Sequence, residues 1–288
     1  MHTRTIFATF AFLLAPLAAQ EKYTLRYDFQ PGTACWTQFD QEMAQNMDMG
    51  GQKMEIAMRS STWMESKVTG VEKGLAAITN RYARVKVKSD APGMNVDYDS
   101  DVAGSDPGPL RAMADLVGKA ATMQIDARGK IVAMKLPEGL GPQFEQVAGS
   151  LKTSMEQSFV AWPEGPVAIG DTWQTQLEIP MQQMGSMKAS VTNKLVAVEG
   201  DVVKLGVTMT FDTSKLQMPG GMQMKAKDST GTMTVSLKSA MPLESTMTTA
   251  FEMGMDDTVV MSMTMKQTMK QVPAPAPKAE PKKEAAPK

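Results

Sequence analysis

Between Val203 and Met269, apolar and polar residues alternate with a period of two, and the apolar residues keep one odd-numbered phase through nearly the whole stretch. Successive side chains of a β-strand point to opposite faces, so this pattern predicts long strands with one apolar face and one Thr, Ser and Lys face. Turn-forming residues separate the runs at Gly200-Asp201, Pro219-Gly220-Gly221, Ala240-Met241-Pro242 and Gly254 to Asp257. Such short connections predict antiparallel neighbours.

The first half of the chain has a similar pattern with a less regular phase. Tyr23, Leu25, Tyr27 and Phe29 alternate with polar residues and predict a strand that ends at Pro31-Gly32. The segment from Trp36 to Val87 is also expected to be stranded, with breaks at Gly50-Gly51 and from Gly70 to Gly74.

Two segments depart from the β pattern and predict amphipathic helices. The first follows Asp106-Pro107, a typical helix start, and ends at Gly118, with Leu110, Met113 and Val117 on one stripe. The second runs from Pro142 to about Phe159, and its apolar stripe contains Phe144, Val147, Leu151 and Met155. We therefore expect an α+β fold that is mostly β, in which long curved antiparallel strands form a half-barrel or incomplete barrel and both helices cover its concave side.

The two ends of the chain read differently from its middle. Arg4, the uncharged run from Thr5 to Leu17 and the pair Ala18-Ala19 have the order of a secretion signal, so cleavage is expected near Ala19. Gln20 stands where a lipid anchor would need Cys, which predicts a soluble periplasmic or extracellular protein. Residues 273–288 contain only Pro, Ala, Lys and Glu and predict a disordered tail. One domain is expected over residues 20–272.

That domain shows signs of an internal duplication. Trp36, a Met-rich hairpin and Thr122-Met123 occur in the first half in the same order as Trp173, a second hairpin and Thr232-Met233 in the second half. The sequence thus predicts two degenerate copies, at about 23–135 and 167–272.

The composition removes most catalytic chemistry. The only histidine is His2, inside the predicted signal, so the exported chain would have no imidazole base or metal ligand. Cys35 is the only cysteine, and neither a nucleophile elbow nor a phosphate-binding loop is present. The net charge of −1 argues against a nucleic-acid partner, and no segment of the predicted mature chain is long enough to span a membrane. We expect a protein that is not an enzyme and carries no cofactor or metal.

An acidic run, Asp97 to Asp101, resembles the start of a calcium loop. That pattern fails, however, because Val102 and Gly108 stand where the loop requires Gly and Glu. The run is better interpreted as a solvated approach to the first predicted helix.

Methionine is the outlier of the composition, with 28 residues. Three interpretations stay open: Met is simply the core residue of the strands, it forms an adaptable surface for an apolar or lipid-like ligand, or its thioethers bind Cu(I) or buffer oxidants. A structural or interaction protein of the envelope would have this face fully packed. The candidate ligand face comprises Met209, Phe211, Met233, Met247, Phe251, Met253, Met261, Met263 and Met265, and the candidate cover comprises Leu110, Met113, Val117, Phe144, Val147, Leu151 and Met155.

The order of several short motifs resembles a family of bacterial secreted proteins with a domain of unknown function. The motifs are Tyr27-x-Phe29-x-Pro31-Gly32, Tyr98-Asp99-Ser100, Asp106-Pro107, Gly118, Asp126-Ala127-Arg128-Gly129-Lys130 and Val167-x-Ile169-Gly170-Asp171-x-Trp173. The resemblance extends from about Tyr23 to Val272 and implies export and one β-rich unit, without functional residues to carry over. In outline the expected fold also looks like the lipoprotein-carrier half-barrels of the bacterial envelope, which is a likeness of architecture only.

Overall fold

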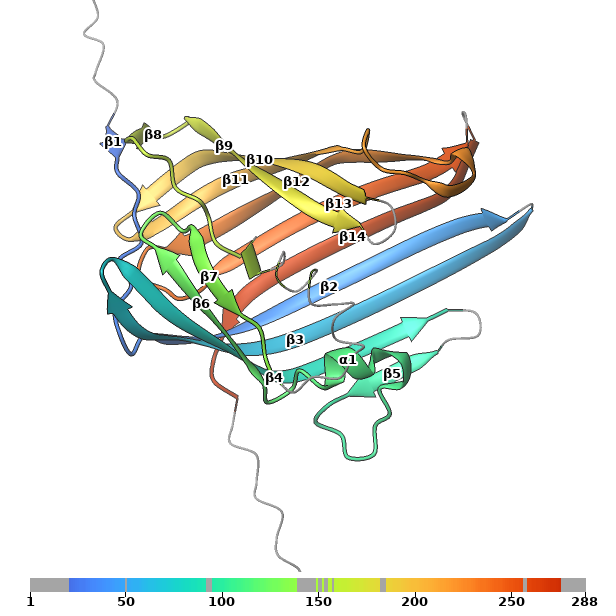
Figure 1. Cartoon of the computed structure of the whole chain (residues 1–288), viewed down its shortest axis with the longest axis horizontal. Helices are drawn as coiled ribbons and strands as arrows, with labels where there is room; N and C mark the ends of the chain where they lie inside the picture. The colour runs from blue at the N-terminus through green and yellow to red at the C-terminus, as the bar shows by residue number, and fades with distance from the viewer. Residues whose placement is uncertain are drawn as a thin grey trace, which may run out of the picture.

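The computed structural model describes residues 21–49, 51–91, 95–138, 149, 152, 155–156, 158–181, 185–255 and 258–275. Most of this part of the chain forms one curved antiparallel sheet of twelve strands (Figure 1). In its first half the strands are β2 (Ala34–Met49), β3 (Gln52–Glu72), β4 (Leu75–Asp90), β5 (Val96–Asp99), β6 (Ala120–Asp126) and β7 (Ile131–Lys135). In its second half they are β9 (Thr172–Met181), β10 (Gly185–Glu199), β11 (Val202–Asp212), β12 (Gln223–Ser236), β13 (Glu244–Met255) and β14 (Thr258–Val272).

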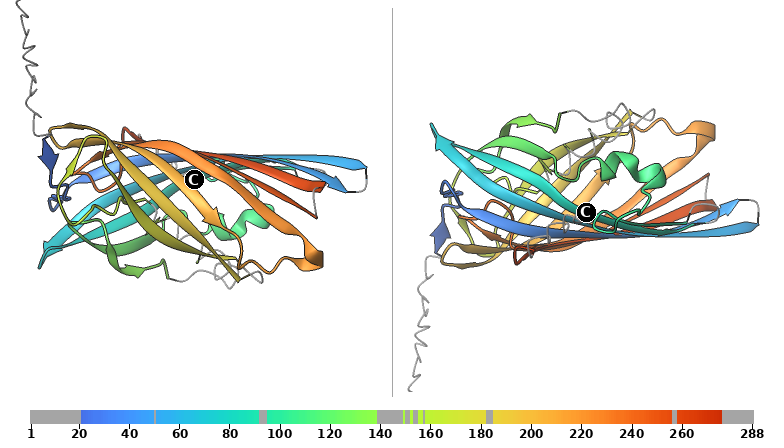
Figure 2. Two further views of the ribbon diagram at one scale, coloured as in Figure 1. Left: turned by 90° about the horizontal axis from the view of Figure 1, so that it is seen from above. Right: turned by 90° about the horizontal axis from the view of Figure 1, so that it is seen from below.

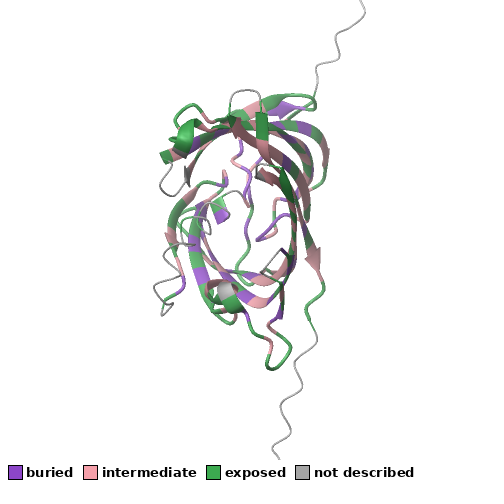
Figure 3. Ribbon diagram, turned by 90° about the vertical axis from the view of Figure 1, so that its right-hand side faces the viewer, coloured by how far each residue is buried: buried purple, intermediate pink, exposed green. Residues whose placement is uncertain are grey.

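The strand order is β7-β6-β4-β3-β2-β14-β13-β12-β11-β10-β9, with β5 beside β4. The two halves therefore meet where β2 pairs with β14, visible as blue beside red in Figure 1. Strands β7 and β9 end this order and do not pair with each other within the described residues, so the sheet is not closed. It curls around a common axis, as Figures 2 and 3 show, and this open, strongly curved sheet agrees with the predicted incomplete barrel.

One end of the curved sheet is filled by apolar side chains from two irregular segments. Leu25, Tyr27 and Phe29 come from the N-terminal segment, and Phe159 and Trp162 from the segment that follows the first half. The Tyr27 and Phe29 rings stack with their centroids 4.8 Å apart, and the Trp162 ring lies 5.5 Å from Tyr27. These aromatic residues belong to a core that continues along the inner side of the sheet.

The N-terminal segment is not the strand that its alternation predicts. Only β1 (Lys22–Tyr23) forms a ladder, with β8 (Val167–Ala168). Beyond it, the Tyr27 amide donates to the Ala127 carbonyl and the Asp28 amide to the Leu237 carbonyl, each at 2.7 Å. Because these two acceptors belong to opposite halves of the molecule, the N-terminal segment crosses the end of the curved sheet. Its side chains are alternately buried and more exposed, as in a strand, although no described strand pairs with this part of the segment.

The fold is mostly β, as predicted, but the helical part of the prediction is wrong in extent. Within the described residues the first predicted helix is a 3-10 turn, η1 (Gly108–Leu110), followed by a single turn of α-helix, α1 (Arg111–Ala114). Asp106 is not the N-cap, which is Pro107 without a side-chain cap hydrogen bond; its carboxylate instead accepts the Gly108 amide at 3.0 Å in a turn before the helix. A further 3-10 turn, η2 (Pro219–Gly221), connects β11 and β12. Most of the second predicted helix, residues 142–159, lies outside the described residues.

Candidate functional site: the methionine-rich inner face

The register of the sheet determines which methionines share a face. In β2, Phe39 packs against the apolar core, so the odd-numbered residues that follow it, among them Met43 and Met47, point to the same concave side. Met269 in β14 is the direct partner of Phe39 and is buried in the same core, which places Met261, Met263 and Met265 on this side too. We call this concave side the inner face.

Three rows of directly opposed residues cross the inner face at the end away from the aromatic core. The first, which we call the thioether row, contains a methionine on each of five adjacent strands, in the order Met54, Met47, Met261, Met253 and Met224. The second row is Ile56, Gln45, Met263, Phe251 and Ala226, and the third is Met58, Met43, Met265 and Thr249. Directly opposed residues have Cβ atoms about 4.5–5.5 Å apart, so each row is a continuous strip of side chains.

A few polar groups interrupt this apolar surface. The Gln45 amide donates to the Met261 sulfur at 2.8 Å, and the Gln41 amide donates to the Met265 sulfur at 2.9 Å. The Ser229 hydroxyl donates to the Thr249 hydroxyl at 2.8 Å, and both residues are buried. The inner face thus combines soft apolar side chains with a small number of oriented polar groups.

The register brings together the sheet residues that the sequence singles out. All nine lie on the inner face of β11 to β14, and the rings of Phe211 and Phe251 have their centroids 5.2 Å apart. They do not form one uniform surface, however. Met233 and Met247 pack against the aromatic core, whereas Met253, Met261 and Met263 lie in the rows at the other end and are half-buried.

Sequence reasoning missed the contribution of the first half to this surface. Met43, Met47, Met54, Ile56 and Met58 extend it across β2 and β3. The signal was present, because Phe39, Met43 and Met47 occupy one alternating phase. What the sequence did not indicate was the pairing of β2 with β14, which joins the two methionine-rich hairpins side by side.

The predicted helix cover is present in part. Leu110, Ala114 and Val117 pack on a small apolar cluster of Val85, Val87 and Tyr98 on the inner face, and Met58 of the third row reaches the same cluster. Met113 is half-buried. Met155 is buried within the aromatic core. Phe144, Val147 and Leu151 lie outside the described residues.

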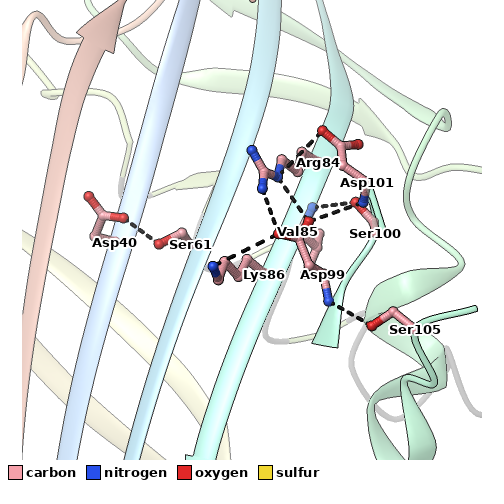
Figure 4. A network of polar contacts seen from close by, with 9 residues as sticks. All are labelled: Asp40, Ser61, Arg84, Val85, Lys86, Asp99, Ser100, Asp101 and Ser105. Carbon is pink, nitrogen blue, oxygen red and sulfur yellow. Dashed lines mark hydrogen bonds and ion pairs between the residues drawn. The ribbon is translucent and has the colours of Figure 1, made fainter. Parts of the chain in front are cut away.

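The acidic run forms ion pairs on the outer side of the sheet, shown in Figure 4. The Arg84 guanidinium donates to both carboxylate oxygens of Asp99, at 3.0 and 2.5 Å, and lies 3.4 Å from the Asp101 carboxylate. This hydrogen-bonded arginine holds the pKa of Asp99 below its usual range. Among the described residues no three His, Cys, Asp or Glu side chains are grouped to hold a metal ion. The run is therefore part of an ion-pair network that fastens β5 to β4.

Cys35 has the surroundings of a packing residue. Its side chain is half-buried against the core, and burial raises the pKa of the thiol. A protonated thiol is a poor nucleophile, so these surroundings do not activate it.

No helix among the described residues is long and apolar enough to cross a bilayer.

Comparison with known proteins gives a fold likeness and a partial family match. A lipovitellin chain, from a structure titled "lipid-protein interactions in lipovitellin", aligns with a TM-score of 0.52 and 10% identity over 88% of this chain and 26% of that chain. This chain therefore corresponds to about a quarter of that protein, and the likeness concerns the fold alone. The translocator domain of the autotransporter NalP from Neisseria meningitidis aligns with a TM-score of 0.32 and 7% identity over 85% of this chain and 91% of that chain, too low for any inference.

Sequence comparison adds one finding. No curated protein sequence matches this chain significantly. Residues 140–240 match the model of DUF6263, a family of unknown function, which confirms the resemblance to such a family that the order of motifs indicates.

Proposed function

We propose that this protein is a non-catalytic exported binding protein that holds an apolar or lipid-like molecule against its inner face. The observation that carries the proposal is the unequal filling of the curved sheet. Aromatic side chains bury one end, whereas the methionines of the three rows at the other end are only half-buried. A contiguous apolar surface that solvent partly reaches often marks a binding site.

The side chains of the rows suit such a ligand. Methionine is unbranched, flexible and polarizable, so a face tiled with it adapts to an irregular apolar molecule such as an acyl chain. Ligand sites of this kind are concave and mostly apolar, with a few polar groups that orient the ligand. The amides of Gln41 and Gln45 and the hydroxyl of Thr249 are suited to that orienting role.

The fold likeness to lipovitellin is consistent with this proposal but is not evidence of binding. A structure titled for lipid–protein interactions shares the strand arrangement of this chain, at 10% identity. Fold alone does not fix function. The proposal therefore depends on the inner face of this chain and on a direct test of binding.

Binding can be tested on the purified protein in two ways. Organic extraction and mass spectrometry of gently purified protein should recover a lipid, and delipidated protein should bind a fluorescent fatty acid. Met263→Lys places a charge in the middle row and should weaken fatty-acid affinity by about tenfold or more, since burying an unpaired charge costs more than 1.4 kcal/mol. Thr264→Lys on the same strand is exposed on the opposite face and serves as the matched control.

A structural or interaction protein gives a different result. A clean extract, together with no fatty-acid binding by the delipidated wild type, would reject the apolar-ligand proposal. Equal affinity in both lysine variants would move the ligand away from the inner face. Circular dichroism of both variants separates a lost site from a lost fold.

A further inference from the structure

We propose that the thioether row is a binding site for a soft monovalent metal ion, Cu(I), with Met47, Met261 and Met253 as its ligands. These three methionines lie directly opposite one another on β2, β14 and β13, in the centre of the five-membered row. The proposal does not rest on the apolar-ligand function, because it concerns the sulfur atoms of the row and not its apolar surface.

The spacing of the strands suits a shared ion. Directly opposed residues on one face have Cβ atoms about 4.5–5.5 Å apart. A metal–sulfur bond of roughly 2.3 Å places the sulfurs of a trigonal site about 4 Å from each other. The three rotatable bonds of methionine allow three neighbouring side chains to close that small difference. Met54 and Met224, the outer members of the row, supply further sulfurs at the same spacing.

The chemistry of the row selects the ion. Thioethers are soft and uncharged, and soft sulfur ligands favour Cu(I), whereas Ca²⁺ and Mg²⁺ require several oxygens. The described residues contain no group of three His, Cys, Asp or Glu that would attract a divalent ion instead. A monovalent ion also brings only one charge to a site that lacks a counter-charge, which lowers the cost of desolvating it.

The row is held in place and is reachable. The Gln45 amide donates to the Met261 sulfur at 2.8 Å, which restrains that side chain and leaves the other sulfur lone pair available. All five methionines are half-buried, so solvent reaches them.

The test measures Cu(I) transfer to the purified full chain under anaerobic conditions, with bicinchoninate as the competing chelator. The wild type should take Cu(I) from the chelator, and X-ray absorption should show a shell of sulfur neighbours only. The triple variant Met47→Leu, Met253→Leu and Met261→Leu keeps the volume and apolar character of the row. Its Cu(I) affinity should fall by more than about 100-fold, because loss of outer-shell partners alone costs 10–100-fold.

Two control variants assign the effect to the row. Met209→Leu, Met233→Leu and Met247→Leu together remove three inner-face sulfurs outside the row, and Cys35→Ala removes the only thiol; both should retain wild-type affinity. Thioethers have no proton to lose, so the affinity of the protein for Cu(I) should stay constant between about pH 6 and 8. Cysteine ligation would instead give a pH-dependent affinity.

The possible outcomes separate this proposal from the apolar-ligand function. No Cu(I) uptake by the wild type overturns the metal site, and equal loss in both triple variants overturns its location. Loss of Cu(I) in Cys35→Ala assigns the metal to the thiol and also overturns the proposal. Fatty-acid binding measured on the same samples should be unchanged in the row variant, since leucine preserves the apolar surface, so failure of one proposal leaves the other to its own test.

Discussion

At the scale of single residues, a bidentate ion pair outside the inner face joins Arg84 and Asp99. Two hydrogen bonds, at 2.5 and 3.0 Å, join the guanidinium to a carboxylate whose residue is buried. Arg84 also lies 4.8 Å from the centre of the Trp63 ring, which holds the guanidinium from its other side. Bidentate pairs of this kind are the strong ones, because both charges and both geometries match.

Asp99→Asn should therefore lower the free energy of unfolding by about 1.5–3 kcal/mol at neutral pH. Asp97→Asn, at an exposed position of the same strand, should change it by less than about 0.5 kcal/mol. Urea unfolding followed by tryptophan fluorescence measures both values. An equal effect of the two substitutions would contradict a specific role of the Arg84 pair.

The same pair predicts a pH dependence. The pKa of Asp99 is lowered in the folded protein, first of all by the hydrogen bond from Arg84. Its stabilisation is complete above the pKa of an unfolded aspartate, about 3.9, and is lost as the pH falls from there through the lowered pKa of the folded state. The stability difference between wild type and Asp99→Asn should thus be constant above about pH 5 and shrink below about pH 4. A difference that grows in acid would contradict this assignment.

Only glycine fits at position 129, because of both the backbone conformation and the close neighbours. Its φ is 85°, and a Cβ added there would meet the Val160 carbonyl oxygen at 2.1 Å and the Tyr27 ring at 2.9 Å. Gly74 has a similar φ of 78°, but a Cβ there meets nothing within 4 Å. Gly74→Ala should cost about 1–2 kcal/mol for the left-handed backbone alone, and Gly129→Ala clearly more. Thermal unfolding of the two variants isolates the cost of the close approach.

At the scale of elements, the sequence predicts the strands well and the irregular segments poorly. The alternation from Val203 to Met269 corresponds to β11 to β14, and the turns fall where Gly and Pro place them. Period two requires only that one face is buried, and in an open curved sheet that condition holds for every long strand.

The N-terminal segment and the region around α1 also pack inside the sheet, but their sequence patterns do not predict their structure. Leu25, Tyr27 and Phe29 alternate because one side of an extended segment faces the core, so their pattern cannot distinguish a strand from a chain that crosses the end of the sheet. Around α1, Pro107 and Pro109 restrict where the helical turn starts, but nothing in their pattern indicates that the helix ends at Ala114. Local pattern alone does not reveal which partner satisfies an apolar face.

Corresponding contacts occur in the two predicted repeats. The Gly32 amide donates to the Val68 carbonyl at 2.8 Å, and the Gly170 amide donates to the Leu195 carbonyl at the same distance. Val68 and Leu195 each stand at an irregularity of their strand, and both are fully buried. The duplication stays a prediction, with which this arrangement agrees.

The crossing segment should make a large contribution to stability for its length. Leu25 is 1% exposed in the core, whereas Thr24 beside it is exposed. Leu25→Ala should lower the free energy of unfolding by about 2–5 kcal/mol, the usual cost of removing a buried leucine side chain, and Thr24→Ala should be nearly neutral. Chemical unfolding measures both. A small effect of Leu25→Ala would mean that the segment leaves the core without opening the sheet.

At the scale of the whole molecule, several contacts join the halves, among them the short β1–β8 ladder. Strands β2 and β14 pair from Trp36 and Val272 to Met47 and Met261, and the crossing segment bonds to Ala127 on one side and Leu237 on the other. The thioether row passes through the same seam, because Met47 belongs to β2 and Met261 to β14. Each proposed site therefore requires both halves.

This arrangement predicts that the two halves fold as one cooperative unit. A chain cut between Glu138 and Ser158 should yield two fragments that copurify, since separation would leave β2 and β14 as unpaired edges with apolar inner faces. The joined fragments should unfold in one transition, at lower stability than the intact chain and in a concentration-dependent manner. Calorimetry at several concentrations distinguishes this from independent folding, in which each fragment alone would show its own cooperative transition.

Thr268→Pro removes a backbone donor in β14 opposite Asp40. This substitution should weaken the association of the fragments more than Thr258→Pro, which changes only the first residue of the strand.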